Sequence, residues 1–351
     1  MKLFYIFGII VSILYVTESF LFFSSGDRLN EYNVDKSQVS VSGISSGGAM
    51  ATQMHVIFSK LFMGVGIIAG TPFACSAGNA ALAVTVCMGT PSAILPSALE
   101  LTASTWATLG NIDPTSNMAN DRVYIFNGRA DSVVNPGIGH ITEAFYEHYV
   151  TDNSNIKTVF NINAEHCMPT SNYGSQCDQQ SKPTDYLSNC NYSAAYDLLN
   201  HIYGGNLKRP TSNTQQNGQL LKFGQDEFFY ISTPATSSMD NVGYIYVPSG
   251  CVDKSKQCKM HVAFHGCEMG QIFFHYSSTI GDKYVRHGGY NEVGELNDII
   301  ILYPQAIKEI LYPVNPHGCW DWWGYTTVAF ATHLGNQPVA LKRMIDRVIG
   351  A

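Results

Sequence analysis

The chain has 351 residues, of which 45% are hydrophobic and only 13% are charged. This apolar content excludes a disordered or collagen-like polymer, because it can bury a large core. The formal net charge is −7 and no run of Lys and Arg is present, so a nucleic-acid partner is not expected.

The N-terminus has the pattern of a secretory signal. Lys2 precedes the apolar run 3–16, and Thr17-Glu18-Ser19 follows it. We expect removal of residues 1–19, which leaves a single catalytic domain at 20–351 that is secreted and has no stable membrane span. A signal anchor is the alternative because the apolar run resumes after Ser19, but Glu18 interrupts it and charge within a bilayer is costly.

Beyond this leader, apolar β-rich runs alternate with helical stretches, which favours an α/β fold with a mostly parallel central sheet. The expected strands are 38–42, 64–68, 122–126, 156–162, 243–247, 261–264 and 299–303. The expected helices are 47–60, 141–149, 194–202, 291–296 and 338–348. The stretch 209–224 is rich in Thr, Gln, Asn and Gly and is expected to be a surface excursion.

The first expected strand and helix flank a G-x-S-x-G sequence, in which Ser45 lies between Gly43 and Gly47. This context is typical of a nucleophile elbow, where small residues allow a sharp turn that exposes the serine hydroxyl. The alternative is an ordinary turn rich in Gly and Ser. If Ser45 is the nucleophile, the N–H of Ser46 is expected to donate to the oxyanion.

Two later segments supply a candidate acid and base. Asp131 follows the expected strand 122–126 after a short turn, and His166 lies in a loop after the next strand. The order Ser45, Asp131, His166 matches that of α/β-hydrolases, where a carboxylate orients the histidine that activates the serine. Glu165 and His265 are the competitors for the acid and base roles. His55 and His201, on or near expected helices, are expected to be packing or surface residues.

The expected strand 261–264 runs into His265-Gly266-Cys267, and a strand followed by this sequence is typical of an oxyanion loop. In most hydrolases of this class that loop precedes the nucleophile, whereas here it follows far along the chain. The simplest interpretation is a circular permutation, which close surface termini make tolerable. The N–H of Cys267 is then expected to be the second oxyanion donor; the alternative is a turn with a structural cysteine.

The nine cysteines favour an oxidising compartment. No CxxC pair is present, which argues against a structural zinc site, and no metal or cofactor is expected. The odd number leaves at least one thiol outside intrachain bridges. The pairs spaced for short-loop disulfides are Cys75 with Cys87, Cys177 with Cys190, and Cys251 with Cys258.

Six motifs, in the same order, make the chain resemble the secreted poly(3-hydroxybutyrate) depolymerases and related esterases of the circularly permuted single-domain type. They are 41–50, 123–131, 164–169, 261–267, 302–305 and 318–325. The resemblance implies an α/β-hydrolase fold with Ser45 as nucleophile, Asp131 as acid and His166 as base. It also implies a disulfide from Cys267 to Cys319, which leaves Cys167 as the candidate unpaired thiol.

The resemblance implies a serine esterase that cleaves poly(3-hydroxybutyrate) or short-chain hydroxyalkanoate esters through an acyl-enzyme. Acetyl or feruloyl esters of polysaccharides are the alternative substrates, and a non-catalytic binding protein of the same fold is a third possibility. Many polymer-degrading members carry a separate polymer-binding module, whereas a single catalytic domain is expected here. Adsorption to polymer would then depend on exposed apolar residues of that domain. The candidates are Trp320, Trp322, Trp323 and Tyr325, which could equally belong to the core.

Overall fold

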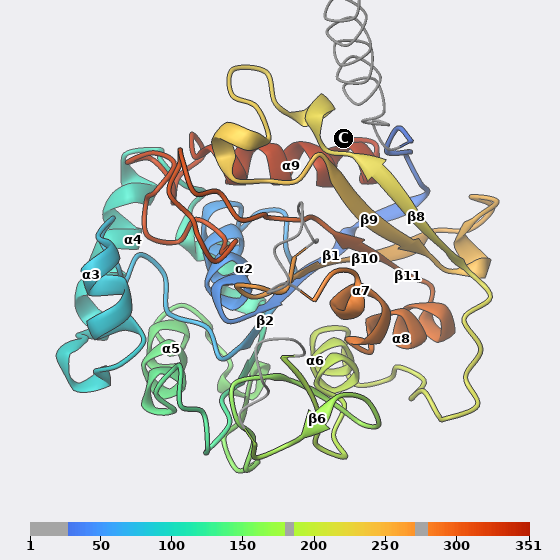
Figure 1. The fold of residues 1–351 in the computed structure, drawn as a ribbon, viewed down its shortest axis with the longest axis horizontal. Coiled ribbons are helices and arrows are strands. Elements are labelled where there is room, and N and C mark those ends of the chain that lie inside the picture. Colours follow the sequence, from blue (N-terminus) through green and yellow to red (C-terminus); the bar gives the residue numbers. More distant parts are fainter. Residues whose placement is uncertain (1–26, 180–185, 271–279) are drawn as a thin grey trace, which may run out of the picture.

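The computed structural model describes residues 27–179, 186–270 and 280–351, so the expected signal at 1–19 lies outside the described residues. An eight-stranded sheet runs through the molecule in the order β4-β3-β2-β1-β10-β11-β9-β8 (Figure 1), and β5, β7 and β6 form a small second sheet. The strands are β1 Val34–Ile44, β2 Gly64–Ile68, β3 Arg122–Phe126, β4 Ile156–Val159, β5 Met168–Thr170, β6 Ser175–Gln176, β7 Leu187–Asn189, β8 Gln219–Gly224, β9 Val242–Val247, β10 Cys258–Phe264 and β11 Ile299–Tyr303. The helices are α2 Ser46–Ile57, α3 Ala80–Leu82, α4 Pro96–Thr108, α5 Gly137–Glu147, α6 Ala194–Ile202, α7 Lys283–His287, α8 Tyr290–Asn297 and α9 Asn336–Ile349.

The central sheet is mostly parallel, as the sequence predicts. Neighbouring strands pair in parallel along the sheet order β4-β3-β2-β1-β10-β11. Strand β9 runs antiparallel to both of its neighbours, β11 and β8. Ser40 of β1 lies opposite His261 of β10, a residue 221 positions later. Because parallel strands end at the same edge, the segments that follow β1 and β10 emerge side by side.

Helices cover both faces of this sheet, and the sheet divides the hydrophobic core into two parts. One core contains residues of α2, α4, α5 and α9, and the other contains residues of α6, α7 and α8 (Figure 1). The inner strands contribute to both cores by alternation: Ile300 and Leu302 of β11 face the first, whereas Ile301 faces the second. Among the described helices, none combines the length and apolarity needed to cross a bilayer.

The expected strands and helices are present, with differences at their ends. The strand expected at 156–162 ends at Val159, and the helix expected at 141–149 begins earlier, at Gly137. The interpretation of 209–224 as a surface excursion is wrong for its last six residues, which form β8. This strand pairs with β9 at the edge of the sheet, where the exposed polar residues Gln219 and Lys222 are tolerated.

The sequence reading missed helix α4, Pro96–Thr108. Its Pro96 occupies the first helical position, a common helix start. However, Leu101 is 69% exposed and only Ala103 is fully buried, so the helix has no clear apolar stripe.

Candidate active site

Ser45 lies in the sharp turn between β1 and α2. Its backbone adopts φ 57° and ψ −123°, a left-handed conformation that is unusual for a residue with a side chain. A Cβ on Gly43 would lie 2.2 Å from the carbonyl oxygen of Gly47, and a Cβ on Gly47 would lie 2.3 Å from the carbonyl oxygen of His265. The turn therefore requires glycine at both positions, once to close on itself and once to pack against the end of β10.

His166 and Asp131, which follow β4 and β3, form a buried hydrogen-bonded pair. Nδ1 of His166 lies 2.9 Å from Oδ2 and 3.1 Å from Oδ1 of Asp131. The N–H groups of Val133 and Val134 also donate to Oδ1 and fix the carboxylate. Since Nδ1–H donates to the carboxylate, Nε2 is the nitrogen left to accept a proton.

The competing acid and base are engaged elsewhere. Glu165 accepts hydrogen bonds from both the N–H and the hydroxyl of Ser132. His265 is fully buried: its Nδ1 donates to the carbonyl of Gly266, and its Nε2 accepts the N–H of Ala306. Burial also lowers the pKa of His265 to about 4. Both ring nitrogens have structural roles, so His265 is not available as a base.

His55 and His201 also have structural partners. His55 is buried between Tyr146 and Asp121, and Nε2 of His201 contacts the carbonyl of Asn155. Both histidines are packing residues, which is one of the two roles expected from the sequence.

Ser45 and His166 line one cavity of about 570 Å³, together with Ser46, Gly266 and Cys267. A Cβ on Gly266 would lie 3.2 Å from the Cβ of Ser45, so the loop after β10 reaches the serine. Ser46 is the first residue of α2, where backbone N–H groups have no acceptor within the helix. The two expected oxyanion donors therefore border the cavity that contains the expected nucleophile and base.

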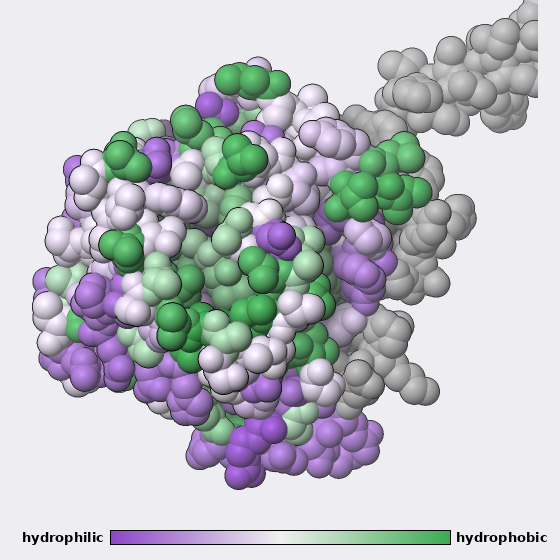
Figure 2. All heavy atoms as spheres, turned by 90° about the vertical axis from the view of Figure 1, so that its left-hand side faces the viewer, coloured by the Kyte–Doolittle hydropathy of each residue, from purple (hydrophilic) through white to green (hydrophobic). Residues whose placement is uncertain are grey.

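The rest of this cavity is largely apolar. Val84, Val133 and Val314 line it and are 63%, 39% and 61% exposed, so the apolar lining continues onto the surface. On the side of the molecule that carries α3, α4 and α5, hydrophobic side chains surround a hollow (Figure 2). An apolar cleft with a few convergent polar groups is the usual form of a site for a small apolar substrate.

The structure separates the four aromatic residues expected to bind substrate. Trp322 and Trp323 line the cavity. The structure corrects the expectation for Trp320: it is fully buried, and its Nε1 donates to the carbonyl of His265, so it supports the loop that follows β10. Tyr325 is also a correction, because its hydroxyl donates to the carbonyl of Cys319 and its ring is absent from the cavity lining.

Eight cysteines form four disulfides in the structure. The three short-range pairs are those spaced for short loops, and Cys267 bonds to Cys319 as the resemblance implies. Cys167 remains outside these bridges and is buried. Burial raises the pKa of its thiol to about 12, so it stays protonated and unreactive beside His166.

Sequence reasoning missed four polar residues of the cavity: Thr71, Tyr186, Glu268 and His317. Glu268 directly follows Cys267 and could have been found from that position. His317 directly precedes the motif 318–325 and could have been found in the same way, whereas Tyr186 lies in a segment without a recognisable motif and only the folded chain brings it to the site.

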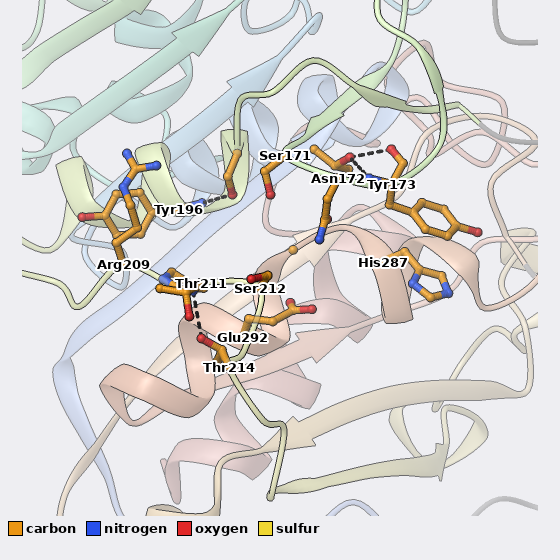
Figure 3. Close-up of a pocket in the computed structure, with 14 residues that line it drawn as sticks. Ser171, Asn172, Tyr173, Tyr196, Arg209, Thr211, Ser212, Thr214, His287 and Glu292 are labelled. Carbon is orange, nitrogen blue, oxygen red and sulfur yellow. Dashed lines mark hydrogen bonds between the residues drawn. The ribbon is translucent and has the colours of Figure 1, made fainter.

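A second pocket, of about 470 Å³, has a different character (Figure 3). Polar side chains from the loop after β5, the start of α6, the segment 209–214 and the α7–α8 region line it. The ring of Tyr173 stacks on His287 at 3.9 Å, and the guanidinium of Arg209 lies 4.2 Å from the ring centre of Tyr196. None of the expected catalytic residues lines this pocket.

The chain matches no family model, but it is similar to curated proteins and to solved structures. It is 38% identical over 326 residues to a poly(3-hydroxybutyrate) depolymerase of Delftia acidovorans, covering 92% of this chain but only 61% of that protein. It is 36% identical over 313 residues to a polyhydroxybutyrate depolymerase of Talaromyces funiculosus, covering 85% of each.

Two solved structures share the fold. They are a PHB depolymerase complexed with R3HB trimer, with a TM-score of 0.81, and the PHB depolymerase from Penicillium funiculosum, with a TM-score of 0.80. Each is 31% identical to this chain and aligns over 92% of this chain and 99% of its own. The fold is therefore that of the α/β-hydrolases, and the chain belongs to the polyhydroxybutyrate depolymerase family.

Proposed function

We propose that the chain is a secreted serine esterase that hydrolyses poly(3-hydroxybutyrate) or short-chain hydroxyalkanoate esters. The observation that carries this proposal is that one apolar cavity contains the strained Ser45, the Asp131-bound His166 and the loop around Cys267. The relatives named as depolymerases favour a polyester substrate over an acetyl or feruloyl ester.

In the proposed mechanism, His166 Nε2 takes the proton of Ser45 as Oγ attacks the ester carbonyl carbon. The carbonyl electron pair moves to oxygen, and the N–H groups of Ser46 and Cys267 stabilise this oxyanion, by about 3–4 kcal/mol each. When the carbonyl reforms, the ester C–O bond breaks, and the leaving alkoxide oxygen receives the proton from His166 and departs as an alcohol. Asp131 holds the imidazole in the required tautomer and stabilises its cation.

The second half of the reaction repeats these steps with water. His166 removes a proton from water as its oxygen attacks the acyl-enzyme, and the proton then returns to Ser45 when the acid product departs. The apolar cavity keeps other water away from the acyl-enzyme and strengthens the hydrogen bonds to the oxyanion.

We also propose that the fold is a circular permutation of the usual hydrolase order, in one catalytic domain at 20–351. The direct pairing of β1 with β10 supports it, because the nucleophile strand and the oxyanion strand are neighbours although the latter comes much later in the chain. The four disulfides support secretion, which agrees with the signal expected at 1–19.

Adsorption to polymer would use the apolar rim of the cavity. Trp323 is partly exposed and packs edge-on against Trp322, and both line the cavity near the exposed Val314. We propose these residues, and not Trp320 or Tyr325, as the aromatic contacts to polyester.

The central experiment compares wild type and Ser45→Ala in hydrolysis of p-nitrophenyl butyrate. We expect the variant to lose at least a thousandfold in kcat; equal activity of the two proteins would remove Ser45 from the mechanism. Product analysis on oligomers of 3-hydroxybutyrate, with acetylated xylan in parallel, tests the substrate class. Release of acetate but no hydroxybutyrate would replace the polyester with a polysaccharide ester.

A further inference from the structure

Glu268 joins three segments of the cavity wall. It follows Cys267 in the loop after β10, and its carboxylate accepts the hydroxyl of Tyr186 at 2.6 Å. Its other oxygen lies 3.0 Å from Nδ1 of His317 and 3.9 Å from Nζ of Lys308. These partners belong to the segment before β7 and to the segment after β11, so one side chain connects regions that are distant in sequence.

Tyr186 extends this connection to the base. While its hydroxyl donates to Glu268, its backbone carbonyl accepts the N–H of Met168 at 2.8 Å. Met168 lies two residues after His166 and begins β5. A short chain of bonds therefore runs from the residue next to Cys267, across the cavity wall, to the segment that carries His166.

The backbone of Glu268 shows that this position is held under constraint. Its φ is 62°, in the left-handed region that non-glycine residues rarely adopt. Its N–H donates to the carbonyl of His317 at 2.7 Å, and its carbonyl accepts the N–H of Ile280. A strained conformation persists only where its surroundings fix it, and here the fixed peptide unit adjoins Cys267.

The charge of Glu268 is balanced by its partners. Burial alone would raise its pKa, but hydrogen bonds from Tyr186 and His317 and the charge of Lys308 together hold it below its ordinary value. Glu268 is thus an anion beside an oxyanion loop, where an uncompensated negative charge would oppose the transition state. Lys308 and His317 allow the carboxylate to hold the loop with little electrostatic penalty.

Resting on the proposed function, we infer that the Tyr186–Glu268 hydrogen bond is a strut that fixes the distance between the oxyanion loop and the base-bearing loop. Tyr186 and Glu268 are positioning residues: they act through Cys267 and His166. A shift of about 1 Å in such groups can lower a rate by about a hundredfold, so loss of this bond is expected to reduce kcat more than substrate binding.

The test measures kcat and KM for p-nitrophenyl butyrate in Tyr186→Phe, Glu268→Ala, Glu268→Gln and the double variant Tyr186→Phe/Glu268→Ala. We expect Tyr186→Phe to lower kcat by about tenfold with KM within about twofold. Glu268→Gln keeps an acceptor oxygen and should lose less than Glu268→Ala. The double variant should be no slower than Glu268→Ala, because the two residues share one interaction.

Tyr246→Phe is the matched control. Tyr246 donates to Glu295 at 2.7 Å, which is also a phenol-to-glutamate bond, but it lies on β9, away from the cavity. We expect this variant to keep wild-type kcat. The strut is overturned if Tyr186→Phe keeps wild-type kcat, changes KM alone, or loses no more kcat than Tyr246→Phe, or if the losses in the double variant multiply.

Ser45→Ala separates this inference from the function beneath it. If Ser45→Ala is inactive and Tyr186→Phe has wild-type kcat, the strut fails while the esterase proposal stands. If Ser45→Ala remains active, the esterase mechanism itself fails, and with it the inference.

Discussion

The two pockets of this molecule use polar groups in opposite ways. The cavity around Ser45 is mostly apolar, and its polar residues are fixed by partners, as His166 is by Asp131 and Glu268 by Tyr186. The pocket around His287 is lined mainly by hydroxyl, amide and charged side chains from loops and helix ends (Figure 3). Polar residues are more numerous in the second, but the residues proposed as catalytic line the first.

The comparison teaches that preorganisation, and not polarity, distinguishes the proposed active site. Gly47 could not carry a side chain without contacting the carbonyl of His265, and the Cys267–Cys319 disulfide fixes the same loop two residues later. Groups held in this way need no reorganisation when charge develops in the transition state, and apolar surroundings strengthen their effect. In the polar pocket, Arg209 and Tyr173 instead stack on neighbouring rings at the surface.

The largest effect is expected when Asp131 is replaced, and the matching replacement of Glu165, the other carboxylate beside His166, is the comparison. Asp131→Asn should lower kcat by about a thousandfold to ten-thousandfold, because an amide can stabilise the wrong histidine tautomer. Glu165→Gln, whose partner is Ser132, should stay within about threefold of wild type. Steady-state kinetics on p-nitrophenyl butyrate make the comparison. Equal losses in the two variants would show that the Asp131–His166 pair has no special role.

Next in size is the loss of the disulfide beside the oxyanion loop. The Cys267–Cys319 bridge closes a segment of 52 residues, and the Cys251–Cys258 bridge closes one of 7. In the chain-entropy model their removal destabilises the fold by about 4 and 2 kcal/mol respectively. The double variant Cys267→Ser/Cys319→Ser should also lower kcat by at least tenfold, because the loop after β10 is then less fixed.

The second bridge is the control for the first. The double variant Cys251→Ser/Cys258→Ser should reduce the free energy of unfolding, measured in urea, and leave kcat within twofold of wild type. A similar loss of kcat in both double variants would attribute the effect to general destabilisation and not to the oxyanion loop.

A smaller effect, visible only in acid, is expected beneath the nucleophile. His261 lies between Ser40 and Ser42, with both ring nitrogens 2.7 Å from their hydroxyls. Burial lowers its pKa to about 3. The folded chain therefore resists protonation at this site more than the unfolded chain does. The stability associated with neutral His261 is complete above the ordinary histidine pKa of about 6.5 and declines as the pH falls towards 3.

His261→Gln tests this dependence, since an amide can still donate to one hydroxyl and accept from the other. We expect the variant to be less stable than wild type at pH 7 but to lose stability more slowly between pH 6 and pH 4. The difference in slope should reach up to about 1.4 kcal/mol per pH unit, measured from urea unfolding. Parallel profiles of unfolding free energy against pH would mean that another group governs acid unfolding. His265, whose pKa burial lowers to about 4, would then be the main candidate.

The sequence predicts the fold, and it also predicts the residues proposed here as catalytic, because both follow largely from local patterns. The strands 64–68, 122–126 and 299–303 match the structure at both ends, as runs of buried apolar residues. Ser45 can be found because its turn needs flanking glycines. These features depend on near neighbours in the chain, which composition and spacing report directly.

Distant contacts that neither a motif nor the family resemblance implies could not be predicted. Trp320 and Tyr325 share one aromatic-rich motif with Trp322 and Trp323, yet the first pair is used for packing and the second borders the cavity. Tyr186 carries no motif at all, since its role arises only when the carboxylate of Glu268 is brought to it. In each case the deciding partner lies far away in the sequence.

The smallest effect is expected in the polar pocket itself. His287→Ala removes the stacked partner of Tyr173, and Arg209→Ala removes the cation above Tyr196. Ring stacks and exposed cation–π contacts stabilise by about 0.5–1.5 kcal/mol, so the free energy of unfolding in urea should fall by about that amount. The kcat and KM for p-nitrophenyl butyrate should stay at wild-type values. A tenfold loss of kcat in either variant would couple this pocket to the catalytic cavity. The contrast between a fixed reactive site and a merely polar one would then no longer hold.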